Sequence, residues 1–365
     1  MFKLKDKLPI GIDIGNHHIY AAQLKRTKSG LTTRALWHRE TQEDIANLLE
    51  EDKLVPHFKA ISTNKQFQGK RVVIKLPPQN IFSFPAQLKV AEGETVEETI
   101  LRKSAEHLTF PIEDAILDYP SLTPEADGKS YKATIVAVSR EDINRYVRII
   151  KKAGLLVEAV DFDVSSLIRL HKHLFETITN IAILCNVGHT QTLLTMATEE
   201  SILGQRSIPW GERGLTDKIL SNIELQNDRN KARTLLKMHG IVHEDRTGVK
   251  GEEAEDHDTI GMRRVLYQIL TPLIDEFVFE FHRMVSYARS EEENPFFEGI
   301  YMYGQAALIK HLDAYMESRV GIQTLQVDPL RNEVFASEEG DVPYSPDNAP
   351  FAMALGLAMR NLPWL

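Results

Sequence analysis

Three short turns carry the residues whose types could hold a phosphate group: Asp13-Ile-Gly15, Asn186-Val-Gly188, and Gly304 at the end of GIYMYG. A glycine at a strand end lets the backbone approach a ligand closely and lets N–H groups point outward toward an anion. We expect a helix after Gly304, whose N-terminal dipole would favour an anion. Each turn alone is more typical of an ordinary tight turn, but the three together predict a nucleotide site.

An internal repeat relates the first two turns. PIGIDIGNHHIYAAQL and IAILCNVGHTQTLLTM both have the pattern strand, turn, strand. The same separation of 173 residues divides Asp13 from Asn186 (186 − 13) and Gly15 from Gly188 (188 − 15). A repeat of this length predicts two related lobes rather than a solenoid.

The elements that position these turns are predicted from periodicity, glycines and capping residues. Besides the two hairpins, strands are expected at 72–76, 131–138 and 299–304. Thr95 with Glu98 has the spacing of a capping box, which predicts that a helix begins there. Further helices are expected at residues 139–153, in the second half of 155–170, and at 214–240, 260–288, 308–316 and 350–360.

The composition narrows the class of protein. A chain of 365 residues with 42% hydrophobic and 26% charged residues is typical of a globular protein with two lobes or more. Its 43 basic and 52 acidic residues give a net charge of −9, which disfavours nucleic-acid binding. The single cysteine, Cys185, excludes an intrachain disulfide and predicts an inert, buried thiol in a reducing compartment. We expect no transmembrane helix and no signal peptide.

Six segments, in order, resemble the PilM-like proteins of type IV pilus and related secretion systems. These proteins are members of the actin, Hsp70 and FtsA superfamily. The resemblance covers nearly the whole chain, and the order of the matching segments is more specific than any one of them. They are GIDIGNHHIYAAQL, HLTFPIEDAILDY, VAVSREDINRYVRIIKKAGLLVEAVDFDVSSLIRL, QRSIPWGERGLTDKI, IYMYGQAALIKHLDAYMESRVG and PFAMALGLAMR.

The resemblance implies an α/β fold: a two-lobed, actin-like (ribonuclease H-like, duplicated) ATPase fold with an inserted subdomain on the first lobe. It also implies a division of the chain. The expected parts are a first-lobe core at 1–84 and 153–175 completed by 345–365, an inserted subdomain at 85–152, and a second lobe at 176–344 with an outer subdomain at 213–290.

The function implied by the resemblance is that of a cytoplasmic scaffold, peripheral at the inner membrane. PilM-like proteins bind the short N-terminal cytoplasmic tail of a PilN-type bitopic membrane protein and contact other pilus or secretion components. We expect an extended peptide to bind in a groove on the first lobe, mainly by main-chain pairing. Membrane contact is expected only through partners.

The resemblance also assigns the nucleotide site. Its expected residues, from the first, second and adenosine motifs, are Asp13, Gly15, Asn16 and His17, then Asn186, Gly188 and Thr190, then Gly304 and Gln305. Three positions depart from the family pattern: Tyr20 replaces a lysine, Asn186 an aspartate and Gln305 a second glycine. We therefore expect a degenerate site that binds ATP with Mg²⁺ weakly or not at all, with no catalytic residue and no metal ligand.

Three other functions remain open from the sequence. One is an active Mg-ATPase of the same complex. A second is a small-molecule kinase of the same superfamily, although no segment matches a kinase substrate motif that would position a carboxylate base. A third is an FtsA-like division protein, which would be expected to end in an amphipathic helix rather than in RNLPWL. The turn histidines His17, His18 and His189 are expected to be polar turn residues rather than metal ligands.

Overall fold

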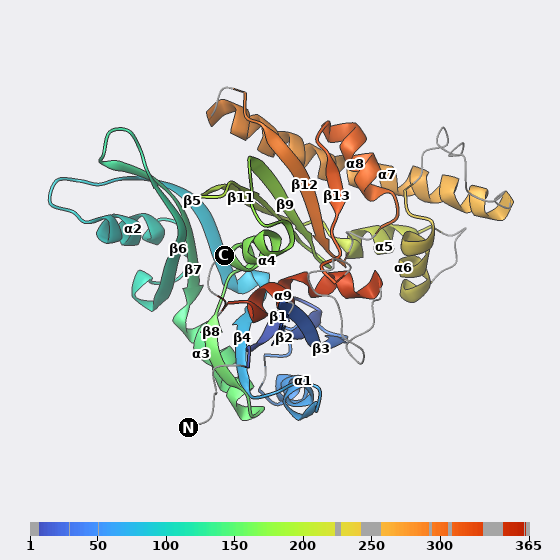
Figure 1. The fold of residues 1–365 in the computed structure, drawn as a ribbon, viewed down its shortest axis with the longest axis horizontal. Helices are drawn as coiled ribbons and strands as arrows, with labels where there is room; N and C mark the ends of the chain where they lie inside the picture. Colours follow the sequence, from blue (N-terminus) through green and yellow to red (C-terminus); the bar gives the residue numbers. More distant parts are fainter. Residues whose placement is uncertain are drawn as a thin grey trace. The chain divides into compact units, whose positions relative to one another are not determined.

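The structure is a computed structural model whose description covers residues 7–28, 30–49, 51–222, 228–241, 257–291, 294–305, 309–330, 346–360 and 362. Packing divides the chain into two compact units (Figure 1). Unit 1 comprises Met1–Ile178, Ala197–Gln205 and Pro329–Leu365, and unit 2 comprises Thr179–Met196 and Arg206–Asp328.

The main sheet of unit 1 has five strands, in the order β3-β2-β1-β4-β8. Strands β1, β2 and β3 form an antiparallel meander, whereas β4 and β8 run parallel to β1. The expected first hairpin and the expected strand at 72–76 are both present. The strands are β1 (Ile10–Ile14), β2 (His18–Thr27), β3 (Gly30–Glu40), β4 (Arg71–Lys75) and β8 (Leu156–Val160).

Alternation along β1 separates the two faces of this sheet. Ile10, Ile12 and Ile14 are fully buried in one core with side chains of two helices, α1 (Glu51–Thr63) and α3 (Arg140–Lys152). Tyr146, Ile149 and Ile150 of α3 belong to that same core. Helix α3, which falls within the expected inserted subdomain, is therefore part of the main hydrophobic core of unit 1.

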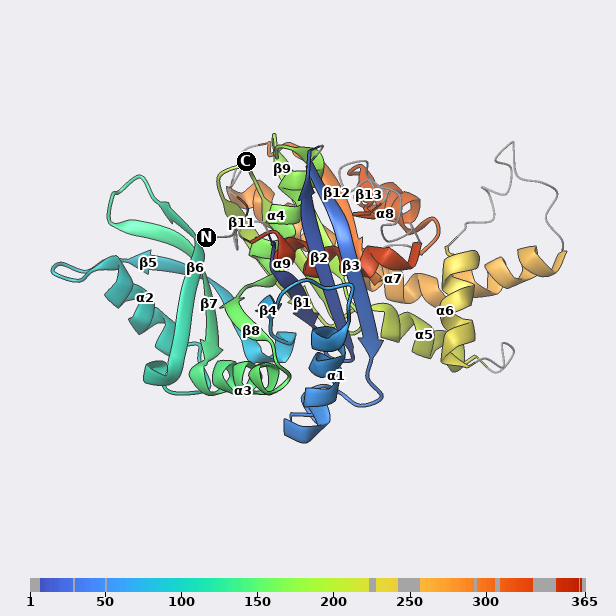
Figure 2. The same cartoon turned by 60° about the horizontal axis from the view of Figure 1, so that its bottom comes forward.

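The opposite face of the sheet is covered by α9 (Ala352–Ala358), which also packs on α4 (Asp163–Phe175) (Figure 2). A Cβ atom on Gly11 would lie 2.0 Å from the carbonyl oxygen of Ala354, and one on Gly356 would lie 2.2 Å from that of Ser166. Only glycine allows such close backbone approaches. The small residues of the C-terminal segment are thus explained by its packing between β1 and α4.

A second, three-stranded sheet in unit 1 has the order β5-β7-β6 and is antiparallel. It comprises β5 (Ile81–Lys89), β6 (Ala115–Pro124) and β7 (Ser130–Ser139), and α2 (Val96–Ala105) packs on it. Leu88, Ile100 and Ile135 form a small core of their own there. This sheet and α2 lie side by side in Figure 1.

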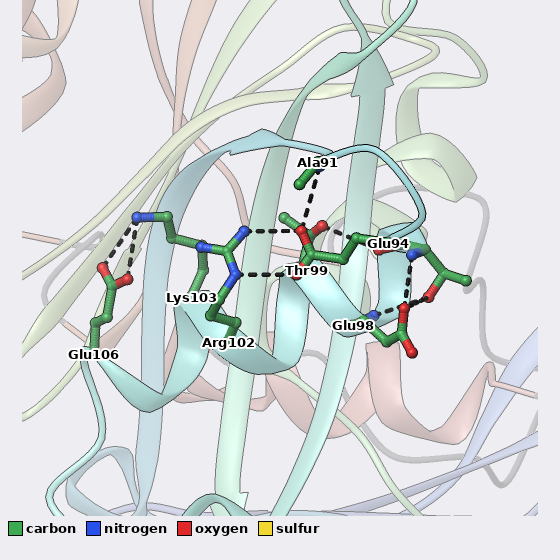
Figure 3. A network of polar contacts seen from close by, with 8 residues as sticks. Ala91, Glu94, Glu98, Thr99, Arg102, Lys103 and Glu106 are labelled. Atoms are coloured by element: carbon green, nitrogen blue, oxygen red, sulfur yellow. Dashed lines mark hydrogen bonds and ion pairs between the residues drawn. The ribbon is translucent and has the colours of Figure 1, made fainter.

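Helix α2 begins where the sequence predicts. The Thr95 hydroxyl accepts a hydrogen bond from the Glu98 N–H, and the Glu98 carboxylate accepts one from the Thr95 N–H (Figure 3). Both carboxylate oxygens of Glu94 lie 3.0 Å from guanidinium nitrogens of Arg102. The hydrogen bond from Arg102 lowers the pKa of the Glu94 carboxyl to about 2. The predicted capping box is confirmed.

The second five-stranded sheet supplies most of unit 2, in the order β11-β10-β9-β12-β13. Its strands are β9 (Ile181–Val187), β10 (Thr192–Ala197), β11 (Ile202–Ile208), β12 (Phe297–Gly304) and β13 (Thr324–Gln326). Cys185 is fully buried in β9, as expected, and burial raises the pKa of its thiol.

The helices of unit 2 form one core with this sheet. They are α5 (Glu212–Leu220), α6 (Arg229–Met238), α7 (His257–Glu291) and α8 (Leu312–Val320). Trp210 stacks on Phe277 with ring centroids 3.9 Å apart, and its indole N–H donates to the carbonyl of Leu273. The helix expected directly after Gly304 begins only at Leu312, and residues 306–308 lie outside the described part. In that part, no helix is both long and apolar enough to cross a bilayer.

Candidate functional site

Each of the two repeated turns is closed by a hydrogen bond, and the two bonds have the same pattern. The Gly15 N–H donates to the carbonyl of His18, and the Gly188 N–H donates to the carbonyl of Gln191, each over 2.9 Å. Both bonds join a glycine to the third residue after it, so the 173-residue repeat is also a repeat of geometry. Both N–H groups donate within their own hairpins, whereas the sequence led us to expect them to point toward an anion.

The first turn also holds the chain that follows β3. The carbonyls of Asn16 and His17 accept hydrogen bonds from the N–H groups of Ile45 and Thr41, each 2.7 Å long. The His17 Nε2 atom lies 3.9 Å from a carboxylate oxygen of Asp44. Two of the predicted site residues therefore have a structural role as anchors.

One row of side chains crosses the main sheet of unit 1 at Asp13. The register of the strands pairs His38 of β3 with Tyr20 of β2, Tyr20 with Asp13 of β1, and Asp13 with Lys75 of β4. Directly paired residues point to the same face of a sheet. Because Asp13 is two residues from Gly11, this is the face that α9 covers.

Lys75 and Asp13 form a buried ion pair. The Lys75 Nζ lies 2.9 Å from Oδ1 of Asp13 and 3.5 Å from Oδ2 of Asp163, the first residue of α4. The exposed side-chain fractions are 5% for Lys75, 13% for Asp13 and 19% for Asp163. Burial alone would lower the pKa of the Lys75 ammonium, but the charges of the two carboxylates outweigh it and raise that pKa.

Neither Lys75 nor Asp163 was assigned to the site from the sequence. The available signal for Lys75 was a lysine directly after the apolar run Val72-Val73-Ile74, at the end of the strand beside that of Asp13. Recognising it requires the register of β1 and β4, which the sequence pattern does not give. Asp163 lies within the long segment VAVSREDINRYVRIIKKAGLLVEAVDFDVSSLIRL, in which no feature of the sequence distinguished it as a site residue.

Tyr20, one of the three positions where we expected a departure from the family pattern, is part of an aromatic cluster. Its ring stacks on His38 with centroids 4.3 Å apart and meets Phe351 edge-on at 5.1 Å. His18 Nδ1 lies 2.9 Å from His38 Nε2. Tyr20 is buried, so this position of the row holds a packed aromatic ring and no charged group.

In unit 2, Gly304 ends β12 against the end of β9. Its φ is +88°, and a Cβ atom there would lie 2.2 Å from the carbonyl oxygen of Val187 and 2.9 Å from the side-chain oxygen of Asn186. The register pairs Gly304 with Val187 and Tyr303 with Asn186. The structure thus brings Asn186 and Gly304 together, and Gln305 follows directly.

The second turn rests on the N-terminus of α5. The Glu212 N–H donates to the carbonyl of Gly188 over 3.2 Å, and Thr190 lies half-buried in the same turn. The Glu212 carboxylate lies 3.2 Å from His189 Nδ1 and 2.8 Å from Arg233 Nε. Burial would raise the pKa of the Glu212 carboxyl, but hydrogen bonds and charges from His189 and Arg233 outweigh burial and lower it. Sequence reasoning missed this charged group.

These donor sets do not fit a divalent cation. Mg²⁺ binds through carboxylates, phosphates and water, with near-octahedral geometry. The Asp13 carboxylate instead contacts an ammonium group, and the equivalent position of unit 2 offers only the amide of Asn186. Nowhere in the described ranges do three or more histidine, cysteine, aspartate or glutamate side chains gather as metal ligands would.

Comparison with known proteins identifies a family and solved structures to which this chain is similar. A family model described as type IV pilus assembly protein PilM matches residues 11–240. Among solved structures, the chain is similar to a PilM–PilN type IV pilus biogenesis complex, at 20% identity over 97% of this chain and 98% of that chain, with a TM-score of 0.74. It also resembles the ethanolamine utilization protein EutJ from Carboxydothermus hydrogenoformans, at 12% identity over 98% and 90% of the two chains, with a TM-score of 0.51. The predicted actin-like α/β fold is confirmed.

Proposed function

The chain belongs to the family of type IV pilus assembly protein PilM, and from this premise we propose that it is a scaffold of a type IV pilus or related secretion complex. The scaffold is cytoplasmic and peripheral at the inner membrane. It binds the N-terminal cytoplasmic peptide of a PilN-like bitopic membrane protein, and it reaches the membrane and other components through such partners. The family match over residues 11–240 carries this proposal, and the likeness to a solved PilM–PilN complex supports it.

The three-stranded sheet of unit 1 is the proposed place for the peptide. Strand β6 is at one edge of that sheet, and in the described ranges it pairs with β7 alone. Ile116 and Tyr119 of β6 are 38% and 37% exposed, so this edge strand presents large apolar side chains to solvent. Both edge strands contain proline, Pro85 in β5 and Pro120 and Pro124 in β6, so each lacks an N–H donor at those positions. We expect an added peptide strand on β6, because this edge strand carries the exposed apolar side chains Ile116 and Tyr119.

The nucleotide site is proposed to be degenerate. The Lys75–Asp13 ion pair supports this, because the carboxylate that would help hold Mg²⁺ is already neutralised. The buried Tyr20 and the amide of Asn186 support it further, since neither supplies the charge of the family's lysine or aspartate. A degenerate site implies that the protein is not an ATPase.

Calorimetry with two ligands tests the proposal. The first is a synthetic peptide copying the N-terminal cytoplasmic tail of a PilN-like protein from the same organism. The second is Mg·ATP, followed by a phosphate-release assay. Peptide binding with background ATP turnover is the expected result. ATP turnover that Asp13→Ala abolishes would establish an active Mg-ATPase instead, and failure to bind the peptide would overturn the scaffold role.

A further inference from the structure

Three charged side chains from three separate elements meet inside unit 1. Asp13 comes from β1, Lys75 from the end of β4 and Asp163 from the start of α4. One atom, Lys75 Nζ, lies within 3.5 Å of oxygens from both carboxylates. A single small cation at that point could therefore contact both acidic groups at once.

The charges of this cluster do not cancel. Two carboxylates and one ammonium leave one excess negative charge in a buried place, where uncompensated charge is costly. The pKa values agree with that balance: burial, together with the nearby charge of Asp13, raises the pKa of the Asp163 carboxyl despite the opposing charge of Lys75. The two carboxylates thus require a cation, and the chain itself provides one.

We propose that Lys75 is a built-in cation that occupies the place of a divalent metal ion between Asp13 and Asp163. Its ammonium makes the pair of carboxylates, Asp13 and Asp163, independent of metal, and its removal exposes a site for a hard divalent cation. Two carboxylates completed by water are suitable ligands for such an ion. This inference extends the degenerate site of the proposed function, but it rests on the geometry of unit 1 and not on peptide binding.

The test measures the binding of Mn²⁺ alone to the full chain, by electron paramagnetic resonance and by calorimetry. Wild-type protein is expected to show no site that depends on Asp13. Lys75→Ala is expected to gain one Mn²⁺ site, at least about tenfold tighter than any binding to wild type, and Lys75→Ala/Asp13→Asn to lose it. Lys103→Ala is the matched control, because Lys103 pairs with the single exposed carboxylate of Glu106 and its loss should create no site.

Thermal unfolding gives a second readout. Mn²⁺ should raise the midpoint of Lys75→Ala and leave wild type unchanged, because a ligand stabilises only the state that binds it. If Lys75→Ala does not fold, Lys75→Gln removes the charge but keeps most of the side-chain bulk, and the same measurements apply to it.

Two results would overturn the inference. One is Mn²⁺ binding to wild type that Asp13→Asn abolishes, because the metal and Lys75 would then share the site. The other is a folded Lys75 variant that binds Mn²⁺ no better than wild type. Wild-type protein that binds the PilN-like peptide and also Mn²⁺ at Asp13 contradicts only this inference, whereas protein that binds neither contradicts only the scaffold proposal.

Discussion

The Lys75 ammonium lies 2.9 Å from the Asp13 carboxylate, and the parallel register of β1 and β4 places the two residues directly opposite each other. The pair lies on the sheet face that α9 covers, and Asp163 of α4 lies beside Lys75, so little water reaches either charge. Because the two charges depend on each other there, substitutions at this pair should have much larger effects than substitutions of surface charges.

Replacing Lys75 by methionine should destabilise the protein by about 3–5 kcal/mol, because it leaves buried carboxylates without their cation. Chemical denaturation measures the change in the free energy of unfolding. The control is Lys103→Met, which removes a surface ion pair with Glu106 and should cost no more than about 1 kcal/mol. If the two substitutions lower the free energy of unfolding equally, the Lys75–Asp13 pair contributes no more to stability than a surface ion pair.

Replacing Gly11 by alanine should destabilise unit 1 by about 1–3 kcal/mol or more, because the new Cβ would lie 2.0 Å from the Ala354 carbonyl oxygen. Strand β1 and α9 would have to separate. Gly214→Ala in α5 is the matched control, since a Cβ there meets no atom within 4 Å and alanine favours the helix. Thermal unfolding should show a lower midpoint for the first variant and an unchanged or higher one for the second.

Acid should destabilise the protein partly through His171, which is fully buried in α4. Burial lowers the pKa of its imidazole to about 4, against an ordinary value of 6.5. Below pH 6.5 the His171 imidazole binds a proton in the unfolded chain, whereas in the folded chain it stays neutral until the pH approaches about 4. The contribution of His171 to stability is therefore complete above pH 6.5, and about 3 kcal/mol is lost as the pH falls to about 4.

The variant His171→Leu should lose less stability than wild type between pH 7 and pH 4.5. Denaturation curves at several pH values measure the difference. His282→Leu, at an exposed position of α7, is the matched control substitution. Parallel curves for His171→Leu and wild type would mean that His171 is not the group responsible.

A charge at either exposed apolar position of β6 should weaken binding of the PilN-like peptide. Ile116→Asp and Tyr119→Asp are each expected to weaken binding by at least about tenfold in calorimetry, because they replace apolar contact surface with a charge. Met238→Asp is the control, as Met238 is an exposed apolar residue of α6 in unit 2. Undiminished binding by both β6 variants would place the peptide elsewhere.

The sequence by itself determined the features that depend on short-range order. The alternation of Ile10, Ile12 and Ile14 fixes a strand, and the glycine that follows fixes the hairpin. The spacing of Thr95 and Glu98 fixes a helix start. The order of six local motifs was enough to identify the family and the fold, because such motifs survive as continuous segments.

Tertiary structure alone decided what surrounds Asp13. Lys75 and Asp163 are distant from Asp13 in the chain, and they reach it only through the pairing of β1 with β4 and the packing of α4. Tyr20 likewise became an aromatic core residue only once His38 and Phe351 were placed beside it. A shift of one residue in strand register would turn Lys75 or Tyr20 to the other face of the sheet. Because register is set by packing across the whole unit, no local pattern in the sequence could have predicted the buried ion pair.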